Sequence, residues 1–211
     1  SYRKNINNVE VSSLIHILYY LSVRVQELNV HSENRFLYEQ LIMYVINVIY
    51  EKIEQESFDE PLYFSLESIL PQLLYVFGEI YSLNIYNERI GKIIEELSWR
   101  ILSFVPRLHS NRLFLLWGLN HLNSLIKSAE YARHMSLIHS HINIETILHE
   151  ELDQNNIFFF RGYLGIYFLI EQLKDYYNLD QRQMVAEIVK QKIFASEAWR
   201  KVKGKEFHSN F

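Results

Sequence analysis

The histidines are the residues of this 211-residue chain whose number and spacing most suggest chemistry. There are nine, and four of them fall between residues 134 and 149. On an unbroken helix a sector of about 80° would hold His134, His141, Glu145 and His149, because each residue turns roughly 100°. Imidazoles and a carboxylate spaced four residues apart can chelate a divalent metal ion.

The segment between these residues argues against a shared metal site. Residues 140–143 read Ser-His-Ile-Asn, which predicts the end of one helix and a new N-cap at Asn143. The new cap would turn His141 out of register with Glu145 and His149. We therefore expect a solvated polar face here, and no bound metal or cofactor.

A second set of residues suggests ligand binding. His16 and His121 occupy equivalent places in a repeated pattern described below, and Trp117, Arg161 and Tyr163 lie beside its third and fourth copies. Aromatic surface, an imidazole and a fixed positive charge would suit a peptide or an anionic ligand. The alternative is structural: histidines satisfied by a backbone carbonyl, a tryptophan in the core and an arginine at the surface.

Acidic residues near helix starts are a third candidate set. A pair of carboxylates in a central cleft can cleave a sugar bond by acid–base catalysis. The candidates are Asp59, Glu60, Glu67 and Asp153. Acidic residues that precede a helix also stabilise its positive end, and this explains them without chemistry.

The elements that would position these residues are helices. Apolar residues recur at intervals of three and four in residues 36–49, 90–102 and 184–193, which is the stripe of an amphipathic helix. Only six glycines and three prolines are available for turns, too few for a β-sandwich. The sequence predicts an all-α fold.

Four segments share an opening of a small residue, then a small residue or histidine three positions later, then an aliphatic residue. They start at Ser13, Ser65, Gly118 and Gly162, with spacings of 52, 53 and 44 residues. Each opening is followed by an apolar helix, a polar connector and a helix with a charged face. We expect the first helix of each unit to sit inside, apolar nearly all round, and the second to face water. Small residues at the start of the first helices, such as Gly118, would let the helix ends crowd together. We expect about four stacked helical hairpins in a single domain over residues 1–211, with units near 9–56, 57–108, 109–154 and 155–205.

Composition excludes several classes of function. The chain has no cysteine, so thiolate zinc sites, iron–sulfur clusters and cysteine nucleophiles are impossible. A net charge of −4 gives no basic surplus for nucleic acid, although residues 199–205 are locally basic. No apolar stretch has the length of a membrane span or a signal peptide. We expect a cytoplasmic protein without a membrane or nucleic-acid partner.

One opening suggests a family. The segment Gly162-Tyr163-Leu164-Gly165-Ile166 resembles the Gly-x-x-Gly-aliphatic opening of an inner helix in lanthionine synthetase C-like (LanC-like) proteins, and the other three openings resemble eroded copies. The resemblance implies an α/α toroid of about seven hairpins, of which four fit here. The family's cyclases hold zinc through two cysteines and a histidine. Because this chain has no cysteine, no zinc ligand carries over.

These observations favour a non-catalytic helical-repeat protein, similar to a degenerate LanC-like protein, that binds a peptide or protein partner as an accessory factor in modified-peptide biosynthesis. The first alternative is an α/α-toroid enzyme, either glycan-processing or metal-dependent, with acidic or histidine residues in its cleft. The second is a dimerisation or scaffold module with a row of exposed tyrosines at Tyr75, Tyr81, Tyr86, Tyr176 and Tyr177. A homodimer is also expected, because an open arc of hairpins leaves apolar flanks uncovered.

Overall fold

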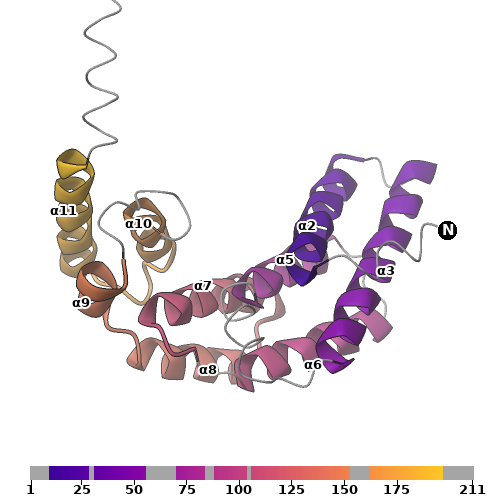
Figure 1. Ribbon diagram of the computed structural model, residues 1–211. Coiled ribbons are helices and arrows are strands. Elements are labelled where there is room, and N and C mark those ends of the chain that lie inside the picture. The colour runs from indigo at the N-terminus through magenta and orange to yellow at the C-terminus, as the bar shows by residue number, and fades with distance from the viewer. Residues whose placement is uncertain are drawn as a thin grey trace, which may run out of the picture. The chain divides into compact units, whose positions relative to one another are not determined.

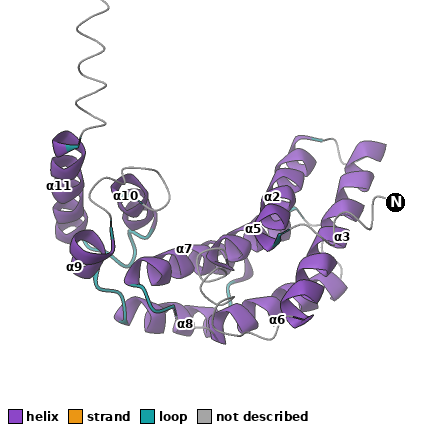
Figure 2. Cartoon of the chain, in the orientation of Figure 1, coloured by secondary structure: helices purple, strands orange, loops and turns teal. Residues whose placement is uncertain are grey.

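A computed structural model describes residues 10–28, 31–55, 70–83, 88–103, 106–152 and 162–196. These residues are almost entirely helical, and none of them is in a strand (Figure 2). The prediction of an all-α fold is confirmed. The helices follow one another in pairs, as the hairpin repeat requires (Figure 1).

The chain divides into two compact units. The first contains Ser1–Pro106 and Phe114–Leu137, and the second contains Arg107–Leu113 and Ile138–Phe211. Two of the three boundaries fall inside helices, α7 (His109–Ile126) and α8 (Ala129–Ser140). Each unit is described separately below.

The first unit consists of two layers of helices. Its first hairpin pairs α2 (Val11–Glu27) with α3 (Glu33–Gln55), and its second pairs α5 (Leu70–Ser82) with α6 (Glu88–Ser103). Across the hairpins, α2 packs on α5 and α3 packs on α6. First helices therefore contact first helices, and second helices contact second helices.

The third hairpin extends both layers. α7 joins the layer of α2 and α5 through close contacts with α5, described with the site below. On the other layer, the Trp99 indole of α6 packs against Tyr131 and His134 of α8, with ring centroids 5.1 Å apart in both contacts. Lys127, with a φ of 58°, ends α7 in the left-handed conformation common after a helix C-terminus.

Burial follows the helical period of the sequence. In α2 the buried positions are Val11, Leu14, Ile15, Leu18, Leu21, Ser22 and Val25, which form one stripe. The prediction for α6 is confirmed, since Ile93, Ile94, Leu97, Ile101 and Leu102 are all buried. In α3 the predicted stripe is wrong at its N-terminal end: Phe36, Leu37 and Leu41 are exposed, and the buried stripe runs through Ile42, Val45, Ile46, Ile49 and Ile53.

Two expectations about the repeat need correction. Gly118 lies in the middle of α7 and not at its start. The first helices were expected to be enclosed on all sides, but α2 exposes Ile17, Tyr19 and Tyr20. The layer of first helices thus has one face in the core and another open to solvent.

The second unit contains α9 (Ile144–Thr146), the π-helical turn η1 (Ile147–Glu151), α10 (Tyr163–Gln172) and α11 (Leu179–Ala195). α10 packs on α11 as a hairpin. α11 begins with a capping box. The Asn178 side-chain oxygen accepts from the backbone N–H of Gln181, and the Gln181 side-chain oxygen accepts from the backbone N–H of Asn178. The Glu151 carboxylate accepts from the backbone N–H groups of His109 and Ser110, at 2.7 and 2.8 Å, and so satisfies the first turn of α7.

Candidate functional site

Two of the predicted ligand-binding residues lie together on α7. Trp117 and His121 are one helical turn apart, and both are half-buried on the open side of the first-helix layer. A single residue of the neighbouring helix joins them: the Tyr75 ring of α5 stacks on both. Its centroid is 4.5 Å from that of Trp117 and 4.1 Å from that of His121, with interplanar angles of 11° and 21°.

A carboxylate completes this cluster from α5. Glu79 lies one turn after Tyr75, and its Oε1 atom is 2.8 Å from His121 Nε2. The ring N–H of His121 does not point along this line, so the contact is a close polar pair and not a linear hydrogen bond. The other oxygen, Oε2, accepts a hydrogen bond of 3.1 Å from the side-chain amide of Gln26 on α2.

Two glycines let α5 and α7 come close enough for these contacts. A Cβ added at Gly78 would lie 2.6 Å from Cδ2 of His121, so the imidazole rests directly on the bare α5 backbone. A Cβ added at Gly118 would lie within 3.0 Å of the Pro71 carbonyl oxygen, closer than such atoms approach. Gly118 does let two helices approach closely, but in the middle of α7 and not at the helix ends, where the crowding was predicted.

The cluster extends across three helices. The Tyr19 ring of α2 is tilted against Tyr75 with a centroid distance of 6.5 Å, and its side chain is 45% exposed. We call Tyr19, Tyr75, Trp117 and His121 the aromatic ladder. Gln26 and Glu79 form its polar edge. The ladder is a continuous ring surface on the open face of the first unit.

Electrostatics inside the ladder favour a neutral Tyr75. Burial raises the pKa of the Tyr75 phenol, and the negative charge of Glu79 raises it further. The phenol therefore stays protonated at neutral pH. The two ionisable groups that remain in the cluster are the Glu79 carboxylate and the His121 imidazole.

The remaining predicted ligand-binding residues lie elsewhere. His16 is exposed on α2. Arg161 is outside the described residues. Tyr163 belongs to the second unit, where it is 1% exposed and its hydroxyl donates to the Leu148 carbonyl at 3.3 Å. The Tyr163 ring is thus part of the core of that unit.

The three residues weighed as metal ligands occupy separate segments. His141 follows the end of α8, Glu145 is in α9 and His149 is in η1. The predicted helix break is confirmed, because the Asn143 side chain accepts from the backbone N–H of Thr146 at 3.1 Å and caps a new helix. Among the residues described by the structure, no group of three or more histidine or acidic side chains is placed to hold a metal ion.

Some predicted features lie outside the described residues or are dispersed. The acidic candidates Asp59, Glu60, Glu67 and Asp153 are outside them, as are the second opening at Ser65 and the basic segment 199–205. Of the tyrosines weighed as an interface, Tyr177 is buried in the second unit, Tyr75 belongs to the ladder of the first, and Tyr86 lies outside the described residues.

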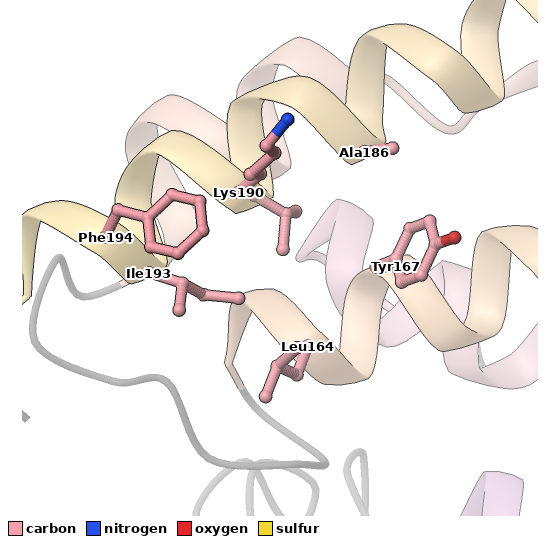
Figure 3. Close-up of a pocket in the computed structure, with 7 residues that line it drawn as sticks. Leu164, Tyr167, Ala186, Lys190, Ile193 and Phe194 are labelled. Atoms are coloured by element: carbon pink, nitrogen blue, oxygen red, sulfur yellow. The ribbon is translucent and has the colours of Figure 1, made fainter. Parts of the chain in front are cut away.

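The second unit has an apolar groove between α10 and α11 (Figure 3). It has a volume of about 460 Å³ and is lined by Leu164, Tyr167, Ala186, Val189, Lys190, Ile193 and Phe194. The single cation of this lining, Lys190, lies 3.5 Å from Glu187. Binding pockets normally combine apolar walls with several convergent polar groups, which this lining does not supply.

Sequence reasoning missed three members of the site, Tyr19, Gln26 and Glu79. A signal for Glu79 was nevertheless present. α5 is mostly apolar, yet it carries Tyr75 and Glu79 one turn apart, just as α7 carries Trp117 and His121. Matching pairs of polar and aromatic residues on two apolar first helices indicate a shared open face.

No protein-family model, curated protein or solved structure matches this chain. Among the described helices, none combines the length and apolar character needed to cross a membrane. The ladder and its polar edge are therefore the features from which a function can be inferred.

Proposed function

We propose that this protein binds a peptide or a protein segment on the aromatic ladder of its first unit, as a non-catalytic binding module of the cytoplasm. The observation that carries the proposal is the row of neighbouring rings from three successive first helices, three of them stacked and the fourth, Tyr19, tilted against Tyr75 and 45% exposed. Aromatic side chains supply large contact areas at low cost in conformational entropy, and they are enriched where proteins bind partners.

The helical repeat supports this proposal. Stacked hairpins place equivalent helices side by side, so side chains from successive repeats form one extended surface. Gln26, Glu79 and His121 add hydrogen-bonding groups along the same surface. A partner with both apolar and polar groups would match this combination better than a small apolar ligand would.

The resemblance of residues 162–166 to LanC-like proteins remains a prediction, and so does closure into a toroid. If the kinship holds, the bound segment would belong to a peptide undergoing modification. The absence of cysteine from the chain is consistent with an accessory role in such a pathway.

A second candidate is favoured by the contact between Glu79 and His121. A carboxylate beside an imidazole is the arrangement that orients a histidine for general acid–base catalysis. A hydrolase of this kind would lose its activity on His121→Gln, tested against a panel of chromogenic ester and glycoside substrates. Unchanged background hydrolysis in wild type and variant would reject this candidate.

A random-peptide display library tests the binding proposal. Selection on the full chain should enrich peptides whose affinity falls about tenfold on Tyr19→Ser. Tyr20→Ser is the matched control, because Tyr20 is on the same helix and is 57% exposed but is not part of the ladder. An absence of enriched peptides, or an equal loss of affinity in the two variants, would contradict the proposal.

A further inference from the structure

The polar edge of the aromatic ladder carries a negative charge that no described cation neutralises by direct contact. The described groups nearest to the Glu79 carboxylate are the His121 ring, the Gln26 amide and the Tyr75 phenol. The amide and the phenol are neutral. With a neutral imidazole, the cluster carries a net charge of −1.

Two arginines of the first unit are paired with other carboxylates. Arg24 of α2 contacts Glu27, and Arg35 of α3 contacts Glu39 at 2.9 Å. Each pair is formed between two residues of the same helix, α2 for the first and α3 for the second. The Glu79 side chain is 19% exposed, and its carboxylate can accept further hydrogen bonds.

From this arrangement we infer that the ladder recognises a cationic side chain, with arginine favoured over lysine, in the peptide segment that it binds. This inference rests on the proposed function. A cation is attracted to the faces of tryptophan and tyrosine rings, and tryptophan is the strongest of these partners. Tyr75 is itself stacked against both Trp117 and His121, so the rings left for a cation are Tyr19, which is 45% exposed, and the face of Trp117 that Tyr75 does not cover. Glu79, one turn from Tyr75, supplies the opposite charge.

Arginine fits the combination better than lysine for two reasons. Its planar guanidinium stacks on aromatic rings, and its fork of N–H groups can donate to a carboxylate while the plane stays stacked. An ammonium group satisfies the charge but does not stack. The inferred ligand also differs from the sequence-based expectation of an anionic one, because that expectation depended on Arg161, and the charge found beside Trp117 and His121 is negative.

The test uses the peptide of highest affinity from the display selection, synthesised with each arginine replaced by citrulline, or each lysine by acetyl-lysine. Both replacements remove the charge with little change of shape. Affinity is measured by calorimetry for wild type, Glu79→Gln and Glu27→Gln. Glu27→Gln is the matched control because it removes an exposed carboxylate of the same unit that lies outside the ladder.

We expect the neutral peptide to bind the wild type about tenfold more weakly. Glu79→Gln should bind the cationic peptide more weakly than the wild type does, by a similar factor. It should bind the neutral peptide with the same affinity as the wild type. Glu27→Gln should bind both peptides as the wild type does. Thermal melting should show Glu79→Gln folded, since glutamine can retain the contacts to Gln26 and His121.

Two other outcomes separate this inference from the proposed function. In the first, peptides bind in a Tyr19-dependent way while their affinity is unaffected by citrulline and by Glu79→Gln. That result would overturn recognition of a cationic side chain and leave peptide binding on the ladder supported. If no selected peptide depends on Tyr19, the proposed function fails, and this inference fails with it.

Discussion

The His121 imidazole lies directly against the α-carbon of Gly78, where an added Cβ would come within 2.6 Å of the ring. The absence of a side chain at Gly78 is therefore what allows His121 to reach Tyr75 and Glu79. A second glycine, Gly118, brings the α7 backbone equally close to Pro71 on α5. The ladder thus depends on two glycines as much as on its own rings.

Gly118→Ala should destabilise the first unit even though alanine is the better helix former. The gain in helix propensity is about 1 kcal/mol, while overpacking against a fixed backbone carbonyl costs typically 1–3 kcal/mol. We expect a net loss of about 1 kcal/mol in the free energy of unfolding, measured in urea. Gly78→Ala is the matched comparison: its neighbour is a side chain that can move, so stability should change less. A stabilised Gly118→Ala variant would contradict the close helix contact.

Arg35→Lys should destabilise the first unit by about 1–2 kcal/mol. The Arg35 guanidinium donates to the backbone carbonyls of Val25, Leu28 and Leu83 and to the Glu39 carboxylate, so it joins the end of α2 to the end of α5. A lysine cannot reach all four acceptors with one ammonium group. Urea denaturation measures the loss, and Arg24→Lys, whose pair with Glu27 is exposed, should change stability little.

Much of the fold follows from the sequence, because the spacing of apolar residues decides which face of a helix is buried. The stripe of α6 and the cap at Asn143 are examples. The site was only partly predictable. Trp117 and His121 could be chosen from one helix, but Tyr19, Gln26 and Glu79 join them only through the packing of α2 and α5.

The same limit explains the residues that were chosen but lie apart from the ladder. Tyr163 stands beside a repeat opening in sequence, yet it is buried in the second unit. His16 is part of the first opening, yet it is exposed to solvent on α2. Position in a repeat predicts the helix, whereas the register between neighbouring helices selects the residues that meet.

Tyr163→Phe should separate a core role for this residue from a binding role. The hydroxyl donates to Leu148 inside the second unit, and its loss should lower the free energy of unfolding by about 1 kcal/mol. Affinity for the selected peptides should remain that of the wild type. A changed affinity at unchanged stability would instead assign Tyr163 to the binding surface.

The second unit should lose stability as the pH falls, through His139. Burial lowers the pKa of this imidazole, which lies against the rings of Tyr176 and Tyr177. The unfolded chain titrates near the ordinary value of about 6.5, so below that pH it binds the proton more readily than the folded chain does. Stability is therefore lost as the pH falls through and below this range.

His139→Phe keeps an aromatic ring in the same place and removes the titration. Urea midpoints at about pH 7.5 and 5.5 should differ less for this variant than for the wild type. Every other ionisable residue is the same in the two proteins, so the difference between the two shifts reports His139. An equal shift in both proteins would show that His139 makes no contribution.

Nuclear magnetic resonance of the tryptophan indole N–H groups tests the central claim, ligand binding on the aromatic ladder, most directly. The signals are assigned by single Trp→Phe substitutions and followed while a selected peptide is added to the full chain. If the peptide binds on the ladder, the chemical shift of the Trp117 indole N–H should change and reach a plateau as peptide is added. The signal of Trp99, which packs on α8, should stay in place. A saturating peptide that leaves Trp117 unmoved would contradict the account.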